Sequence, residues 1–372
     1  MRRQGKSAAA FVFGALVFLG IGAAAYVYNT SLFEREVPKI TIDSEIEWNL
    51  KDPISVNISD ASGLRFVKAT LNDGEKSVVL ESKEMKQPQM SVDLNLSFPK
   101  TGFGANKKAF ELTIEAIDAS KWNFFAGNSV SVKSILKVDT KRPEVSVIAS
   151  SYKIMKGGAA TVIFRAHDEA MKSLYVETNF GKKFYPTPFH KEGYYISLVA
   201  WPTHVNTFSA SIVAKDRAGN VTRAQVPYFL QDRKYKTSTI PLLDSFLDGK
   251  IADLIGEMAP ERSSLSRLEK FKFVNETMRQ SNEAAILKVT SVVPTARISE
   301  FSIKPFYPLR NGKVVASFGD HRFYEYEKQP VSESHHLGLD LASNAQAAMQ
   351  TSNDGVVVFA RENGIYGNNI IL

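Results

Sequence analysis

Two residues near the C-terminus, His336 and Asp340, have the types and the spacing of a pair of metal ligands. Alternate side chains of an extended strand point to opposite faces, so His336 and Asp340 would share one face. Gly338 lies between them on that face and leaves room for both side chains to reach one ion. A neutral imidazole and a carboxylate are ordinary zinc ligands. The opposite face would be apolar and suited to a core, because it carries Leu337, Leu339 and Leu341.

His335 falls on the leucine face in this interpretation, so His336 is the better ligand candidate. A single His-x-x-x-Asp spacing also occurs often by chance, and its context has to support a metal site. The context is a series of short predicted strands. One covers 313–318 after the Asn311-Gly312 turn, one covers 356–360, and one begins at Asn369.

Composition limits the chemistry that the chain can perform. The sequence has 372 residues, enough for two or three domains, and no cysteine, so disulfides, thiol catalysis and cysteine-ligated zinc are excluded. The formal net charge is +7, without a long basic block. A mildly basic surface suits a membrane or an anionic polymer, and nucleic acid is not an expected partner.

The first segment predicts export from the cytoplasm. Arg2, Arg3 and Lys6 precede an uncharged stretch whose most apolar part covers residues 8–28. About 20 apolar residues suffice to span a bilayer, and flanking basic residues stay in the cytoplasm. We therefore expect a single-pass inner-membrane protein with a cytoplasmic N-terminus and the bulk of the chain in the periplasm. Cleavage as a signal peptide at the small residues 23–25 is the alternative.

The region from Pro38 to Leu230 alternates between apolar and polar residues with turn signals between the runs, as β-strands do. A weak repeat of about 100 residues, typical of immunoglobulin-like sandwiches, aligns Asp60 with Asp168 and Asp118 with Asp216. Two Ig-like modules are the prediction. An aromatic cluster in the first module is assigned to core packing rather than to ligand binding; it comprises Trp122, Phe124 and Phe125.

A helical period replaces the strand period after Asp232. The first apolar stripe includes Leu247, Ile251 and Ile255, and the second includes Phe271, Val274 and Met278. Ser263 or Ser264 is the expected N-cap of the second helix.

The last 61 residues, 312–372, resemble the first half of the M23 (lysostaphin- or LytM-type) zinc metallopeptidase domain. Four elements match in order: residues 317–322 resemble the family's Phe-Gly-x-Arg element, 336–340 fit His-x-Gly-x-Asp, 354–357 fit Asp-Gly-x-Val, and 364–368 fit the Gly-Tyr-Gly-Asn turn. The resemblance implies that His336 and Asp340 bind Zn²⁺. It also implies hydrolysis of cross-link or stem peptides of peptidoglycan, in the cell wall of a Gram-negative organism.

One departure from the M23 pattern is large. The family takes its third ligand and its catalytic histidine from a later His-x-His motif, and none of the six histidines lies beyond His336. The resemblance therefore places no catalytic residue within the chain and leaves the substrate-binding residues unknown. We expect a C-terminally truncated enzyme without activity of its own. His321 is the disfavoured alternative as a substitute ligand.

The predicted fold is mainly β, with a transmembrane helix, two Ig-like sandwiches, a helical linker and a partial LytM-type domain. The alternatives are a non-catalytic M23-like regulator that binds and activates another cell-wall hydrolase, and a scaffold of Ig-like modules. Peptidoglycan, the inner membrane and other cell-wall enzymes are the expected partners. The predicted boundaries are 1–33 for the anchor, 34–140 and 141–232 for the β modules, 233–295 for the linker, and 296–372 for the incomplete peptidase domain.

Overall fold

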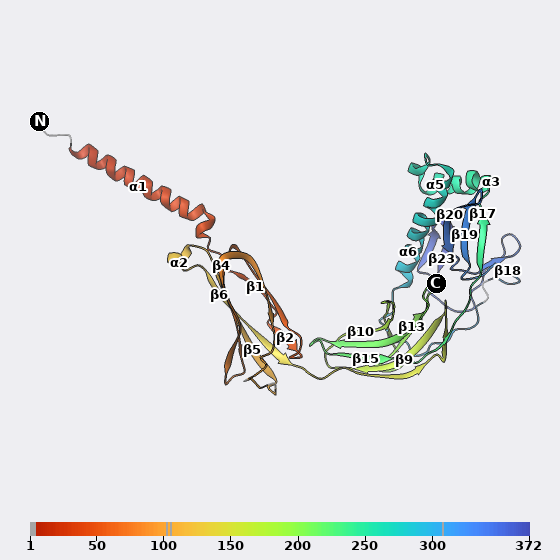
Figure 1. Ribbon diagram of the computed structural model, residues 1–372, viewed down its shortest axis with the longest axis horizontal. Helices are drawn as coiled ribbons and strands as arrows, with labels where there is room; N and C mark the ends of the chain where they lie inside the picture. Colours follow the sequence, from red (N-terminus) through yellow and green to blue (C-terminus); the bar gives the residue numbers. More distant parts are fainter. Residues whose placement is uncertain (1–4, 102, 105, 307–308) are drawn as a thin grey trace. The chain divides into compact units, whose positions relative to one another are not determined.

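The chain is mainly β, with several separate sheets, a pair of helices in its middle and one apolar helix at its N-terminus (Figure 1). The computed structural model describes residues 5–101, 103–104, 106–306 and 309–372. Arg2 and Arg3, which supported the orientation of the anchor, lie outside the described residues. The chain divides into two compact units: residues 1–143, 168–172 and 215–221 form the first, and residues 144–167, 173–214 and 222–372 form the second.

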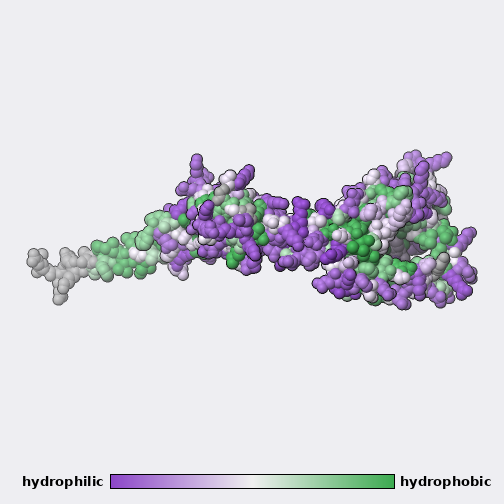
Figure 2. All heavy atoms as spheres, turned by 90° about the horizontal axis from the view of Figure 1, so that it is seen from below, coloured by the Kyte–Doolittle hydropathy of each residue, from purple (hydrophilic) through white to green (hydrophobic). Residues whose placement is uncertain are grey.

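Helix α1, Gly5–Asn29, is followed by the 3-10 turn Ser31–Phe33. Its segment Ala10–Asn29 is long and apolar enough to cross a membrane. Figure 2 shows that hydrophobic residues cover its surface. This helix confirms the predicted apolar segment, and it suits either a signal sequence or a single membrane anchor.

The first β module is one sheet in which the strands follow the order β1-β3-β5-β6-β2, with β4 paired to β3. Two long strands, β3 and β4, fold as an antiparallel pair, and β2 pairs with β6 in parallel. The helical turn α2, Trp122–Phe125, lies between β5 and β6. The strands cover Lys39–Thr41 (β1), Glu45–Trp48 (β2), Ile54–Asn72 (β3), Ser77–Leu96 (β4), Ala109–Asp118 (β5) and Ser129–Val138 (β6).

Alternation in the sequence produces the core of this module. In β5 every second residue is buried, and Leu112 and Ile114 are fully enclosed with Leu64 and Leu71 of β3. The aromatic cluster does not join this core: no residue of α2 is buried, and Phe124 is 100% exposed. The core assignment for this cluster was therefore wrong. A tight turn, not a strand, carries its side chains away from the sheet.

The second β module contains two four-stranded sheets, ordered β11-β10-β14-β15 and β12-β13-β9-β7 (Figure 1). A short parallel pair, β8 with β16, completes the module. The strands are Glu144–Ser150 (β7), Lys153–Met155 (β8), Ala159–His167 (β9), Met171–Thr178 (β10), Lys183–Phe184 (β11), Thr187–Pro188 (β12), Tyr194–Ala200 (β13), Ala210–Asp216 (β14), Val221–Gln225 (β15) and Phe229–Gln231 (β16).

Two helical stretches are present, as the change of period predicted, but they begin only at Asp244. Strand β17, Thr237–Pro241, precedes them within the range that was predicted as a helical linker, and that part of the prediction was wrong. Each helical stretch is interrupted by a π turn. The first stretch comprises α3 (Asp244–Phe246), the π turn Leu247–Ile251 and α4 (Ala252–Met258). A 3-10 turn, Pro260–Arg262, separates the two stretches. The second stretch comprises α5 (Arg267–Lys272), the π turn Phe273–Met278 and α6 (Arg279–Thr290).

The predicted apolar stripes form one core. Leu247, Ile251 and Ile255 are buried with Phe271, Val274 and Met278, and Tyr324 of the following sheet packs against them. The predicted N-cap was wrong by two or three residues. Ser266 caps α5 in a reciprocal capping box with Glu269, a pairing that Ser263 and Ser264 do not make.

The C-terminal residues form a three-stranded sheet and two strand pairs. β17 pairs in parallel with β19, and β19 pairs in antiparallel with β20. β18 pairs with β21, and β22 pairs with β23. A 3-10 turn, Gly364–Tyr366, precedes β23. The strands are Lys313–Ala316 (β18), His321–Tyr326 (β19), Gln329–His335 (β20), Asp340–Ala342 (β21), Phe359–Glu362 (β22) and Asn368–Ile371 (β23).

Candidate metal centre

The backbone around His336 is fixed by two hydrogen bonds to the turn before β19. The amide of Gly319 donates to the carbonyl of His336 (2.7 Å), and the amide of His336 donates to the carbonyl of Asp320 (2.9 Å). Gly319 has a φ of +86°, a left-handed conformation that glycine adopts without steric cost. Gly319 and Asp320, which belong to the matched element at 317–322, therefore support the backbone of the candidate histidine directly.

The side chain of His336 is held at both ring nitrogens. Nδ1 lies 2.9 Å from the carbonyl oxygen of Ser317, and Nε2 lies 3.0 Å from Oδ1 of Asp340. A carbonyl can only accept a hydrogen bond, so Nδ1 carries a proton. Nε2 and the Asp340 carboxylate then face each other as two acceptors, unless a second proton or a cation lies between them. The structure thus brings the two predicted residues together.

The alternation had predicted that His336 and Asp340 share one strand, and the structure shows that they do not. β20 ends at His335, and Asp340 begins β21, which pairs with β18. The chain leaves one partner strand for another between these positions and bends at Gly338. The expectation of a buried leucine face was also wrong, because Leu337 and Leu339 are more than half exposed.

Asp320 is a buried residue that stabilises the turn before β19. This residue is 6% exposed, and its carboxylate accepts hydrogen bonds from the Ser238 hydroxyl (2.8 Å) and from Nε of Arg322 (3.3 Å). Burial by itself raises the pKa of Asp320, but the bonds from Ser238 and Arg322 outweigh it and hold that pKa below its ordinary value. Asp320 is therefore a charged structural link between β17 and β19.

His321 and His335 form a separate pair beside this site. They face each other across β19 and β20, their rings stack at 4.2 Å, and Nε2 of His321 lies 3.1 Å from Oε2 of Glu333. Burial, together with the neighbouring His321, lowers the pKa of His335. His321 is thus engaged with Glu333 and His335. Within the described part of the chain, no third His, Asp or Glu ligand joins His336 and Asp340.

The other matched elements also lie in the second unit. The turn at Gly364 is tied to helix α6, because the Ile365 amide donates to Oδ1 of Asn282 (3.1 Å). The strand predicted at 356–360 begins later, at Phe359. Val356, Val357 and Val358 are at least half exposed, and the amide of Val358 donates a hydrogen bond to the carbonyl of Ile371 in β23 (2.9 Å). The predicted start of the strand at 356 was therefore wrong, because the pairing with β23 begins only at Val358 and Phe359.

Two groups of acidic residues were not predicted as sites. Glu34, Asp60 and Asp118 have carboxylate oxygens within 4.8 Å of one another, and so do Asp139, Asp168 and Asp216. Burial raises the pKa of Glu34, and the charges of Asp60 and Asp118 add to this effect. The sequence repeat aligns Asp60 with Asp168 and Asp118 with Asp216, and this was the signal that could have revealed both groups.

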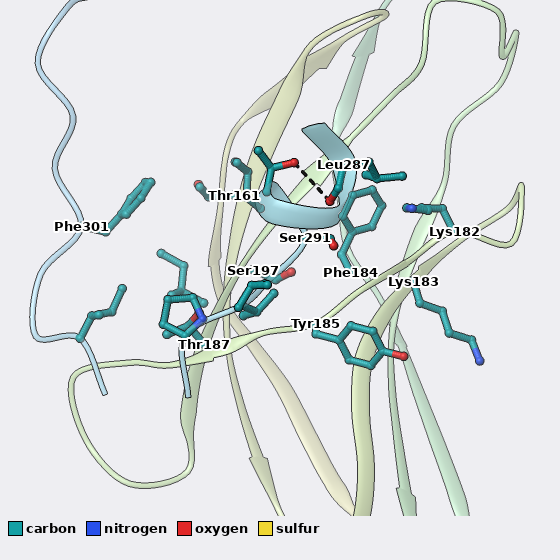
Figure 3. A pocket seen from close by; sticks show the side chains of 17 residues that line it. Thr161, Lys182, Lys183, Phe184, Tyr185, Thr187, Ser197, Leu287, Ser291 and Phe301 are labelled. Atoms are coloured by element: carbon teal, nitrogen blue, oxygen red, sulfur yellow. Dashed lines mark hydrogen bonds between the residues drawn. The ribbon is translucent and has the colours of Figure 1, made fainter. Parts of the chain in front are cut away.

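A cavity of about 560 Å³ lies elsewhere in the second unit. Its walls are mostly apolar, and Phe184 and Phe301 lie on opposite sides of it in Figure 3. None of its lining residues comes from the segment 312–372. The cavity is therefore not part of the His336 site.

No protein-family model matches the chain, and no curated protein matches it. Solved structures that match include one described as tandem Ig repeats of Dlar. That match is 12% identical, covers 54% of this chain and all of that chain, and has a TM-score of 0.20. A similarity this distant carries no argument about function.

Proposed function

We propose that the chain belongs to an exported, membrane-anchored zinc endopeptidase of M23 type that cleaves cross-link or stem peptides of peptidoglycan. One observation carries the proposal: Nε2 of His336 and Oδ1 of Asp340 lie 3.0 Å apart while Nδ1 of His336 faces a carbonyl. Zinc-binding histidines commonly donate their second ring N–H to such a group, which fixes the tautomer.

The pair fits a zinc ion on geometric grounds. Ligand atoms at about 2.1 Å from a tetrahedral ion lie about 3.4 Å from each other. The observed separation of 3.0 Å needs only a small rotation of the exposed Asp340 carboxylate to reach that value. The imidazole needs no rotation, because Ser317 already holds it. Oxygen-only ions such as Ca²⁺ are disfavoured by the imidazole ligand.

A zinc ion bound here would supply Lewis acidity toward a peptide carbonyl and toward water. The contribution of this chain is orientation: the carbonyl of Ser317 orients the His336 ring, and the turn at Gly319 and Asp320 holds the His336 backbone in place. By the M23 resemblance, the general base lies outside the chain. We therefore propose no measurable hydrolysis by residues 1–372 alone.

The remaining parts are assigned supporting roles. Residues 8–28 would anchor the protein in the inner membrane, with the rest in the periplasm. The two β modules would act as Ig-like spacers, and the C-terminal strands as part of a LytM-type domain. These strands expose apolar residues that a further layer of a LytM-type domain would cover; they include Val314, Val315 and Ile370.

A non-catalytic role is the second candidate. It is favoured by one observation, the lack of a third ligand beside His336 and Asp340 within the described residues. In this role the domain would bind and activate another cell-wall hydrolase. Such a protein would need the fold of the His336 turn but not its metal.

Zinc binding by the full chain tests the proposal. We would measure bound zinc by equilibrium dialysis for the native chain, His336→Ala, Asp340→Asn and the control His167→Ala, whose residue lies in another module. We expect each site variant to lower affinity at least about 10-fold, and the control to leave it unchanged. Equal binding by all four proteins would overturn the metal assignment.

Peptidoglycan digestion separates the two candidate functions. The gene product extended beyond Leu372, if a His-x-His motif follows, is expected to release muropeptides, and His336→Ala in that product should abolish release. If the extended product binds zinc but releases nothing, the non-catalytic role is favoured. Release by residues 1–372 alone would contradict the proposed division of the active site.

A further inference from the structure

The α2 turn exposes three aromatic residues beside the end of the apolar helix. Phe124 is 100% exposed and Phe125 is 66% exposed. Trp122 opens the turn and is partly exposed. Large aromatic side chains fully open to water are unfavourable in a soluble protein, and together they mark a contact surface.

The backbone of the turn is held in this exposed conformation. Asn123, Phe124 and Phe125 have φ values of +45°, +54° and +69°, which are strained for residues with a side chain. Arg65 supports them from the sheet, because its guanidinium donates to the carbonyls of Phe125 (3.4 Å) and Ala126 (2.5 Å). The module thus carries backbone strain to present these rings outward, without gaining any core burial from them.

The turn is joined to the segment that follows α1. The amide of Lys121 donates to the carbonyl of Leu32 (2.7 Å). The guanidinium of Arg35 lies 4.3 Å from the ring centre of Tyr28 and 4.6 Å from that of Trp122. Tyr28 is the last aromatic residue of α1, where a spanning helix would leave the bilayer. Arg35 therefore places Trp122 near the depth of Tyr28.

From these contacts we infer that the α2 turn inserts its aromatic side chains into the interface of the membrane that α1 crosses. Trp and Tyr favour the headgroup level, and phenylalanine favours the adjacent acyl region. Three basic residues adjoin the turn and suit lipid phosphates: Arg35 lies over Trp122, Arg65 bonds the carbonyls of Phe125 and Ala126, and Lys121 directly precedes the turn. The inference rests on the proposed anchoring of α1 and adds a second membrane contact, which would restrict the tilt of the first β module.

Depth measurement on the full chain in lipid nanodiscs tests this inference. The native sequence has no cysteine, so a single introduced cysteine carries a nitroxide label at one known position. We would label Phe124→Cys in the turn and Val17→Cys within α1. Glu75→Cys serves as the matched control. Glu75 is exposed and lies in the turn after β3 of the same module, at the end of the sheet opposite to α2.

Collision rates with oxygen and with a water-soluble nickel complex report depth. We expect the label at 124 to collide often with oxygen and rarely with the nickel complex, as a label in lipid does. Its depth should be shallower than that of the label at 17. The label at 75 should collide often with the nickel complex. Adding Phe125→Asp should move the label at 124 toward water. A label at 124 that behaves like the label at 75, while the label at 17 is buried in lipid, would overturn the inference and leave the anchor intact. If the label at 17 is also open to nickel, the anchor and the inference both fail.

Discussion

The ring of Tyr235 lies directly against Gly319, so a Cβ at position 319 would overlap Cδ1 of the tyrosine. The hydroxyl of Tyr235 donates to the carbonyl of Lys156 (2.5 Å), and the ring contacts Phe318 edge-on at 5.9 Å. Tyr235 is therefore held by its hydroxyl and by its ring, and both contacts oppose its movement away from Gly319. Because the amide of Gly319 supports His336, this contact links the fold to the candidate metal site.

Replacement of Gly319 by alanine should destabilise the protein more than replacement of Gly181. Both glycines have positive φ, +86° and +78°, but among the described residues no non-adjacent atom lies within 4 Å of the place that a Cβ would occupy at residue 181. Gly181→Ala should cost about 1–2 kcal/mol for backbone strain. Gly319→Ala should cost about 1–3 kcal/mol more for the clash with Tyr235. Urea unfolding measures both, and equal losses would contradict the role of this contact.

The Asp320 carboxylate should make stability fall in acid. Its pKa is lowered in the folded state, so the unfolded chain binds the proton more readily. The stabilising contribution is complete above the unfolded pKa of about 3.9, and it is lost as pH falls through the lower folded pKa. Asp320→Asn should lower the free energy of unfolding by about 1–3 kcal/mol at neutral pH and less in acid.

A matched control for Asp320 is Asp232→Asn. The Asp232 side chain is 74% exposed, and it lies 4.0 Å from Lys156. The Lys156 side chain is mostly buried, but the Asp232 carboxylate stays in water at a distance of 4.0 Å. A contact this long to an exposed carboxylate contributes little to stability, so the control should leave the acid dependence unchanged. The same pH profile for wild type and Asp320→Asn would show that another group controls acid unfolding.

Asn275 should be the most sensitive polar residue of the helical section. It is 4% exposed, and its Nδ2 donates to Oγ of Ser332 (2.9 Å) and to the carbonyl of Glu333 (3.1 Å). Asn275→Ala removes both bonds and also the one that Oδ1 of Asn275 accepts from Arg279 (3.0 Å), at a cost of about 1–3 kcal/mol. The exposed neighbour Gln280→Ala should change stability by less than about 0.5 kcal/mol. Thermal unfolding compares the two.

Asn128 and Asn220 should respond alike to substitution, because they make the same contacts in the two acidic groups. Nδ2 of Asn128 donates to Asp118 (2.7 Å) and to the carbonyl of Glu34 (3.0 Å). Nδ2 of Asn220 donates to Asp216 (2.8 Å) and to the carbonyl of Asp139 (2.9 Å).

Alanine at either position should cost about 1–3 kcal/mol. Aspartate should cost more at neutral pH, because it adds a negative charge to three carboxylates, and the excess should shrink in acid. Unfolding of the four single variants at two pH values measures this. A different order of alanine and aspartate at the two sites would show that the groups are not equivalent.

The sequence predicted local features well where one pattern determined them. The apolar helix at 5–29 and the stripes through Leu247 and Phe271 follow from composition and period alone. The pairing of His336 with Asp340 was also predicted, but for an incorrect reason. The alternation rule required one strand, whereas the structure uses two strands that pair with different partners.

Other features depend on contacts distant in sequence. Phe124 has the large apolar side chain of a typical core residue, and only the left-handed backbone of the turn directs it outward. The support of Asp320 by Ser238 joins residues 82 positions apart, so no local pattern predicts it. The capping box is visible in the sequence as the S-x-x-E pattern of Ser266 and Glu269. This pattern marks the observed helix start, whereas the predicted caps Ser263 and Ser264 do not.

The parallel pairing of β17 with β19 has a consequence for how the protein is made. Thr237 pairs with His321, so the helices are synthesised between two neighbouring strands of one sheet. Closing a loop of this length is entropically costly and slows folding. Until β19 has been synthesised as far as Tyr326, β17 lacks its only partner strand in this sheet and exposes unpaired backbone groups. A fragment that begins at residue 296 would lack this strand permanently, and we expect it to aggregate where the longer chain folds.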